Sequence, residues 1–293
     1  MSDQGYQTEG TGLGMLAWIG VSIVSFAVFL AMFSPWIIPY DPTQATENVS
    51  MPPPPLSAWP SLFWQTIVDG APVPHWFGTD ASGLDVFSRT IEATRTDLII
   101  ALSANIVSII IGVSLGVISG YYKNLWTETL IRTSDLLQSF PVFITAMILV
   151  ALAGRSWVNI VLAMSLLYAP IYLRLTRSEV LALRERGFIE SARSLGKTEF
   201  AIARQHIFPN AIGSSLIQFS VTIGFAILLT AGLSFVGAGV RPPTPEWGSM
   251  IATGATQLVL GDWWPSLFPG IAISVTVFGF AICGHVLEKR YGR

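Results

Sequence analysis

The stretch Arg184-Glu-Arg-Gly-Phe-Ile-Glu-Ser-Ala-Arg-Ser-Leu-Gly-Lys-Thr-Glu-Phe-Ala-Ile-Ala-Arg-Gln-His-Ile-Phe-Pro209 is a polar, basic island between two long apolar runs. Apolar runs of that length are typical of membrane helices, so we expect the island to be a loop at one membrane face. For the island taken alone, the alternative is an amphipathic helix lying on the membrane surface.

Part of this island is close to a phosphate-binding P-loop. The segment from Ser191 to Thr198 departs from the pattern Gly-x-x-x-x-Gly-Lys-Ser/Thr only at its first glycine, which Ser191 replaces. That glycine lets the backbone wrap around the phosphates. No strand-like apolar run precedes the segment, because residues 175–189 are charged and helical in character. We therefore predict that the island does not bind ATP.

The composition places much of the chain in contact with lipid. Of its 293 residues, 52% are hydrophobic and only 12% are charged, with a mean hydropathy of +0.58. These charges are too few to cover a water-soluble surface. The single cysteine, Cys283, lies in an apolar run, which excludes a disulfide or a cysteine-based metal site within one chain. The expected surroundings are a lipid bilayer, and no nucleic-acid partner is expected.

Six apolar runs are long enough to cross about 30 Å of hydrocarbon. They cover residues 13–39, 98–121, 133–153, 157–173, 211–237 and 262–287. The sequence therefore predicts an all-α integral membrane protein with six transmembrane helices, the third of which Pro141 should kink near its start. The expected divisions are a cytoplasmic tail (1–12), the first transmembrane helix (13–39), a Pro/Trp-rich extracytoplasmic segment (40–97), and a five-helix core (98–293) that contains the loop 174–210.

The distribution of basic residues orients the chain. With six crossings both termini lie on one side of the membrane, and that side receives twelve of the sixteen Lys and Arg residues. Cytoplasmic loops carry the excess of such residues, so both termini and the island should face the cytoplasm.

Small residues recur every four positions along the second apolar run, at Ala104, Ser108, Gly112, Gly116 and Gly120. This spacing places them on one face of a helix, where small side chains let a second helix approach closely. We predict helix packing along this stripe, above all at its three glycines.

The cores of the six runs contain no Asp, Glu, Lys or Arg. Proton and ion relays need ionisable groups within the membrane, so a proton-coupled carrier is not expected, nor is a membrane-embedded hydrolase. We predict no catalytic residues, no metal site and no cofactor in this chain, and we expect the energy for transport to come from another protein. Four uncharged polar residues are candidates for lining a pathway, although bonding between helices is the more common role: Asn105, Asn159, Gln218 and Thr222.

The island also resembles the EAA loop of permease subunits of ATP-binding-cassette importers, the segment that docks into the ATPase. The resemblance rests on Glu190-Ser191-Ala192, on Gly196, and on Ile207-Phe208-Pro209, with Ser191 and Phe208 as mild departures from the family's Glu-Ala-Ala and Ile-Leu-Pro.

Two further segments resemble the dipeptide, oligopeptide and nickel permeases. Residues 75–89, His-Trp-Phe-Gly-Thr-Asp-Ala-Ser-Gly-Leu-Asp-Val-Phe-Ser-Arg, are similar to a signature of that family, although Leu84 replaces the family's arginine. For His75 alone, a structural role is the expectation. Residues 237–248, with Pro242-Pro243-Thr-Pro245, resemble the family's proline-rich segment before Trp-Gly.

The resemblance covers about residues 75–290 and implies a type I importer permease of a bacterial cytoplasmic (inner) membrane, of the second, C-type kind. Its implied partners are a second homologous permease, two cytoplasmic ATP-binding subunits and an extracytoplasmic solute-binding protein. Glu190 would reach a basic group on the ATPase, and Gly196 would turn the chain between two short helices. The residues implied in coupling are Glu190, Ser191, Ala192, Leu195, Gly196, Ile207 and Pro209.

Two questions of function stay open at this point. The solute is expected to be a di- or oligopeptide, with nickel or another small solute as the alternative. From a different class, a nucleotide-independent channel or scaffold is also compatible with the composition.

Overall fold

The computed structural model describes the backbone of residues 4–291 and the side chains of residues 14–290. Within the described backbone the regular structure is helical, and the only β-type pairing is the isolated bridge between Thr79 and Asp85. Parts of the expected tail (1–12) and the last two residues lie outside this range. Five helices are long and apolar enough to cross a membrane, and a sixth crossing is made if one sharply bent pair counts as a single span.

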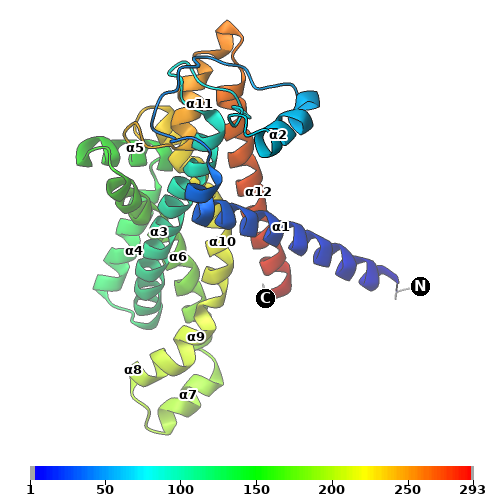
Figure 1. Ribbon diagram of the computed structural model, residues 1–293. Coiled ribbons are helices and arrows are strands. Elements are labelled where there is room, and N and C mark those ends of the chain that lie inside the picture. Colours follow the sequence, from blue (N-terminus) through cyan, green and yellow to red (C-terminus); the bar gives the residue numbers. More distant parts are fainter. Residues whose placement is uncertain (1–3, 292–293) are drawn as a thin grey trace.

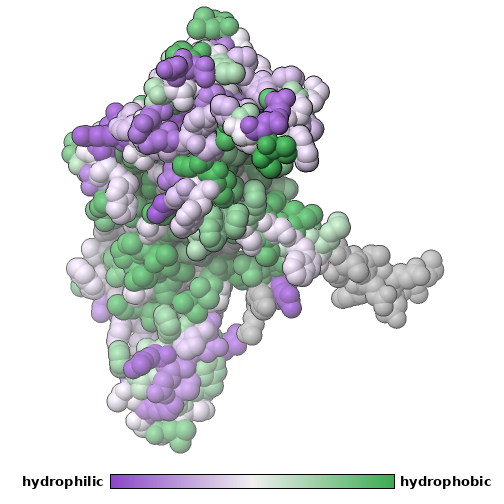
Figure 2. All heavy atoms as spheres, viewed as in Figure 1, coloured by the Kyte–Doolittle hydropathy of each residue, from purple (hydrophilic) through white to green (hydrophobic). Residues whose placement is uncertain are grey.

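Most of the long helices form an elongated bundle, from which the N-terminal part of α1 projects sideways (Figure 1). The long helices are α1 (Gln4–Ile37), α3 (Val86–Tyr121), α4 (Leu125–Gln138), α5 (Val142–Ala153), α6 (Trp157–Arg184), α10 (Gly213–Phe235) and α12 (Trp264–Tyr291). The short helices lie at its two ends: α7 (Gly187–Ser194), α8 (Glu199–Ile202) and α9 (Phe208–Ala211) at one, α2 (Trp59–Val68) and α11 (Trp247–Ala255) at the other. Figure 2 shows apolar side chains across the middle of the visible face of the bundle and hydrophilic side chains toward both ends.

The observed helices depart from the expected boundaries in four places. Helix α1 already begins at Gln4, within the expected tail, and α3 begins at Val86, twelve residues before the expected span at 98. Helix α6 runs past residue 173 to Arg184, so the first third of the loop 174–210 is helix. The expected third span, 133–153, is not one kinked helix, because α4 and α5 meet at an angle of 95°.

The bundle is built around the pair α3 and α6, which pack against each other more extensively than any other two elements. The glycines of the predicted stripe lie at this contact. A Cβ at Gly112 would lie 2.4 Å from the Ala169 carbonyl oxygen, and one at Gly116 would lie 2.7 Å from Thr176 Cβ. Only glycine allows the two backbones to come this close, as in other membrane helix pairs with small residues at the contact.

Polar contacts add to this pair at the end of the stripe that carries Ser108. The hydroxyls of Ser108 and Ser165 donate mainly within their own helices, to the carbonyls of Ala104 (2.7 Å) and Val161 (2.6 Å). Each hydroxyl also lies 3.2 Å from a carbonyl of the other helix, Ser108 Oγ from that of Ser165 and Ser165 Oγ from that of Ala104. These buried, shared hydrogen bonds supplement the close backbone packing.

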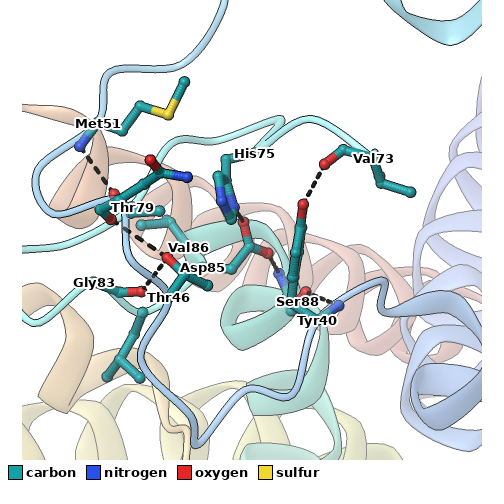
Figure 3. Close-up of polar contacts among 12 residues, drawn as sticks. Tyr40, Thr46, Met51, Val73, His75, Thr79, Gly83, Asp85, Val86 and Ser88 are labelled. Atoms are coloured by element: carbon teal, nitrogen blue, oxygen red, sulfur yellow. Dashed lines mark hydrogen bonds and ion pairs between the residues drawn. The ribbon is translucent and has the colours of Figure 1, made fainter. Parts of the chain in front are cut away.

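The segment between α1 and α3 is fastened to the start of α3 by the residues of the first signature (Figure 3). The buried His75 donates from Nδ1 to Asp85 Oδ1 (2.7 Å), and Asp85 Oδ2 accepts from the Ser88 N–H (2.7 Å), capping α3. The ring of Tyr40 stacks on His75 with ring centres 4.4 Å apart. We call His75, Asp85 and Tyr40 the outer clasp. These contacts show the structural role that was expected for His75.

The same signature also binds the extended chain that follows Tyr40. The backbone of Met51 forms two bonds with Thr79, one to its Oγ1 and one from its N–H (both 2.9 Å). Gly78 has φ +75°, and a Cβ there would lie 2.4 Å from the Met51 carbonyl oxygen. Leu84, at the position of the family's arginine, donates its N–H to Asp80 Oδ1 (2.9 Å). Backbone bonds of this kind do not depend on the side chain at 84.

Candidate functional site at the α7–α9 loop

The segment from α7 to α9 has a small hydrophobic core of its own, which attaches it to α3 and α6. Five of its buried side chains pack against Tyr121 at the end of α3 and against Val180 and Leu183 in the last turns of α6. Those five are Ile189, Ala192, Ile202, Ile207 and Ala211. Burial of several apolar side chains makes this segment a folded extension of the bundle and not a flexible linker.

The local sequence explains the reversal between α7 and α8. Helix α7 ends just before Gly196, whose φ of +79° is in the left-handed region that glycine adopts without a Cβ penalty. Thr198 then caps α8 by accepting the Ala201 N–H on its Oγ1 (3.3 Å). Helix α8 runs without a break through a π-helical turn (Ala203–Ile207) into α9, and Pro209, which has no N–H to donate, lies just after that turn. The backbone thus turns at Gly196, between two short helices, as the resemblance implies.

The seven predicted coupling residues divide into two groups. Ala192 and Ile207 are buried in the loop's core, whereas the other five are exposed: Glu190, Ser191, Leu195, Gly196 and Pro209. Leu195 is 82% exposed and Phe200 is 72% exposed. Phe200 was not among the residues predicted from the sequence. The signal that could have identified it was its place on the polar side of a short amphipathic helix. Large apolar side chains left bare at the tip of a polar loop are typical of a contact surface.

The described residues of the loop form one ion pair. Arg193 Nε lies 2.7 Å from Glu199 Oε1, and the Tyr121 hydroxyl donates to the same carboxylate. Lys197 Nζ donates to Gln205 Oε1 (3.1 Å). Within the described part of the chain, Glu190 forms no ion pair and no side-chain hydrogen bond. Its carboxylate is therefore available to a group outside this chain.

The near-P-loop segment has a different backbone from a phosphate-binding loop. Ser191 to Ser194 form the last turn of α7, and the Leu195 N–H is bonded to the Ser191 carbonyl (3.1 Å). In a P-loop the N–H groups of a strand-to-helix loop point at the phosphates. Here a helix precedes the glycine, so those donors are used within the helix.

Two of the four candidate pathway residues bond to neighbouring helices and turns. Asn105 is fully buried, and its Oδ1 accepts from the Tyr172 hydroxyl (2.8 Å) across the α3–α6 contact. Asn159 donates to the carbonyls of Ala153 (2.7 Å) and Gly154 (2.9 Å), closing the turn after α5.

The other two candidates lie together on α10. Gln218 Nε2 donates to Thr222 Oγ1 (3.2 Å), and both line an open, mainly apolar groove of about 510 Å³ between α5, α6 and α10. Tyr168 of α6 and Phe143 of α5 form the opposite walls. A lining role for the four polar residues stays a prediction, and this groove is the place where Gln218 and Thr222 would exercise it.

Comparison with known proteins matches this architecture to one family. The family model described as "Binding-protein-dependent transport system inner membrane component" matches residues 112–293. The glutathione transport system permease protein GsiD of Pectobacterium atrosepticum is 33% identical over 265 residues, covering 90% of this chain and 82% of the relative. The proteins of the same name from Escherichia coli O6:K15:H31 and Shigella boydii are 32% identical over 277 residues, covering 93% of this chain and 84% of each relative. The chain therefore belongs to the family of inner-membrane permease components of binding-protein-dependent transport systems.

Proposed function

We propose that this permease forms half of the transmembrane pathway of an ATP-driven importer and receives the movement of an ATPase through the α7–α9 loop. The observation that carries the proposal is the construction of that loop. Its core is anchored on α3 and α6, while Glu190, Leu195 and Phe200 are exposed at a surface where this chain gives them no partner. A rigid tip that presents both apolar side chains and a charged group is suited to a coupling contact.

The packing also supports a route for the movement. A displacement of α7 acts on Val180 and Leu183 through the loop's core, and thus on the end of α6. Helix α6 cannot slide independently of α3, because glycines bring the two backbones together at several successive turns. Packed elements of this kind move as rigid bodies and do not bend continuously. The loop, α6 and α3 would therefore move together.

The proposed assembly contains a second homologous permease, two cytoplasmic ATP-binding subunits that hydrolyse the ATP, and an extracytoplasmic solute-binding protein. This chain itself would hold no cofactor. We place both termini and the α7–α9 loop in the cytoplasm, on the basis of the twelve basic residues on that side. The C-terminal end of α12 lies toward the same end of the bundle as the loop (Figure 1).

For the solute we propose peptides of a few residues. The support is the name of the similar proteins, which are glutathione permeases, together with the signature at residues 75–89. The ligand of the solute-binding protein that stimulates this importer decides the question. Isolation of that protein with a bound peptide agrees with the proposal, whereas a bound nickel ion or another non-peptide solute contradicts it.

The coupling role is tested with the charge reversal Glu190→Lys. In the reconstituted importer we expect loss of ATPase stimulation by solute and binding protein, with the complex still assembled. The reversal removes an acidic group from the first turn of α7, which costs about 0.3–1 kcal/mol and leaves the fold intact.

Glu185→Lys is the matched control, because Glu185 is equally exposed, lies five residues away and precedes α7. It should retain stimulation. Wild-type stimulation in Glu190→Lys, or equal loss in both variants, would remove Glu190 from the coupling contact.

A further inference from the structure

Two acidic side chains from distant parts of the sequence meet at the outer end of the bundle. Asp97 lies in the fourth turn of α3 and is 1% exposed, and Glu246 precedes α11 and is fully buried. Asp97 Oδ2 accepts from the Trp247 N–H (3.1 Å), while Glu246 accepts from the next two N–H groups, of Gly248 (3.0 Å) and Ser249 (2.9 Å). Three successive N–H donors at one helix start therefore hold the two carboxyl groups next to each other.

The hydrogen bonds of this pair are incomplete unless a proton is added. Both oxygens of Glu246 have N–H donors, but Asp97 Oδ1 is buried and has none. The Ser234 hydroxyl of α10, 5% exposed, also has no hydrogen-bond partner. A buried carboxylate oxygen without a donor is costly, and two adjacent carboxylates cannot both be ionised without strong repulsion.

The surroundings offer no positive charge to compensate. Within the described residues, neither acid takes part in an ion pair. Basic side chains of neighbouring segments have other partners: Arg89 donates to the carbonyls of Pro42 (2.8 Å) and Pro243 (3.5 Å), and Arg155 donates to the Gly239 carbonyl (3.4 Å). Arg95 lines a separate groove between α1 and α3, and Arg241 is exposed. Glu92 is the other acid in the first turns of α3.

We propose that Asp97 and Glu246 form a proton-binding site, in which one proton on Asp97 Oδ1 donates to the ionised Glu246 carboxylate. Glu246 is the better anion of the two, because two N–H groups at a helix start donate to it and only one donates to Asp97. Burial raises the pKa of Glu246, and those donors oppose the rise. The shared proton turns a repulsive contact into a bond.

This site fixes the outer loop to α3. Trp247, next to Glu246, also donates its indole N–H to the Thr90 carbonyl (3.0 Å), so the start of α11 is attached to α3 at two levels. Separation of α11 from α3 would admit water to Asp97, which would then lose its proton. The proton therefore favours the arrangement in which α11 is packed on α3.

Infrared spectroscopy of the full-length chain in its assembled complex tests the proposal directly. At pH 7 the wild-type protein should show the carbonyl stretch of a buried protonated carboxylic acid. The band should be lost in Asp97→Asn and retained in Glu92→Gln, the control on the same helix. Absence of the band in wild type at pH 7, or its persistence in Asp97→Asn, would overturn the proposal.

Thermal stability gives a second readout that separates the proton from other cations. If the native state keeps a proton that the unfolded chain releases, the free energy of unfolding falls as pH rises above about 4. The Asp97→Asn variant has no such proton. We therefore expect a downward slope of stability with pH in wild type that is smaller in Asp97→Asn, and Asp97→Asn should be at least as stable at pH 7 because its amide donates to Glu246. Identical slopes overturn the proposal. So does stabilisation of wild type, but not of Asp97→Asn, by sodium chloride over choline chloride, since the site would then hold a sodium ion.

Discussion

Gly116→Leu should destabilise the permease through the contact between α3 and α6. A Cβ at this position would lie 2.7 Å from Thr176 Cβ and 2.8 Å from the Leu173 carbonyl oxygen. The second of these is backbone, so no side-chain rotation can relieve the clash and the helices must separate. Overpacking costs about 1–3 kcal/mol, and we expect the upper end of this range. The corresponding fall in melting temperature is roughly 5–10 °C.

The assay is thermal unfolding of the purified complex, followed by size-exclusion chromatography with fluorescence detection. Gly270→Leu is the matched control, because Gly270 lies inside α12 and a Cβ there meets nothing within 4 Å. This control should melt within a few degrees of wild type. If both variants melt at the same temperature, the close approach of α3 and α6 does not limit the stability of the fold. The same comparison shows whether assembly with the partner permease requires this contact.

Three other substitutions probe the two ends of the bundle. Asp85→Ala removes the cap of α3 and the partner of His75, so we expect a loss of about 1.5–5 kcal/mol, from roughly 0.5–2 for the cap and about 1–3 for the unpaired ring; thermal unfolding checks it, and a loss under 1 kcal/mol would contradict the role of the outer clasp. Gly196→Ala should cost about 1–2 kcal/mol from its φ of +79°, whereas Gly187→Ala, in the same loop and equally open, should be neutral. Thr198→Cys, in a variant whose native cysteine is replaced by serine, should react with a membrane-impermeant maleimide in inside-out vesicles and be protected when the ATPase is present; equal labelling with and without it would argue against docking at this loop.

Hydropathy and spacing were sufficient to predict the helical membrane fold. The stripe at Gly112, Gly116 and Gly120 also indicated where two helices approach most closely, because only a period of about four residues keeps glycines on one face. The stripe could not identify which helix packs against it. The residues of α6 that meet it, such as Ala169, Thr176 and Val180, recur at helical spacing but are not uniformly small, so they do not stand out in the sequence.

The boundaries were harder to predict, for a physical reason that differs from helix to helix. Helix α6 continues through the polar residues after 173 because Val180 and Leu183 keep one face apolar and pack on the loop's core. A hydropathy window averages these apolar residues with the polar ones around them, so it does not detect the apolar face. The start of α3 at Val86 depends on capping by Asp85, whose partner His75 lies ten residues earlier. The 95° angle after Gln138 exceeds what a proline kink alone predicts.

The candidate site was predictable to the extent that its residues form a local pattern. The coupling residues lie within one short stretch, and resemblance identified them together. Asp97 and Glu246 are separated by about 150 residues, and each alone is an unremarkable acid at the edge of an apolar run. Their significance depends on the fold, which brings Asp97 to the N–H groups at the start of α11.

Helix α3 connects the two ends of the molecule. At 36 residues and 1.5 Å per residue it is roughly 54 Å long, enough to extend beyond the hydrocarbon core. The outer clasp lies at its N-terminus, its first four turns contact Trp247, and its last residue, Tyr121, lies in the core of the α7–α9 loop. Helix α1 has few buried residues, and α4 is joined to α5 at a sharp angle, so neither is held to the bundle as firmly. We therefore expect α3, α6 and the α7–α9 loop to move as one body during transport, with the outer loop carried along for as long as Asp97 keeps its proton.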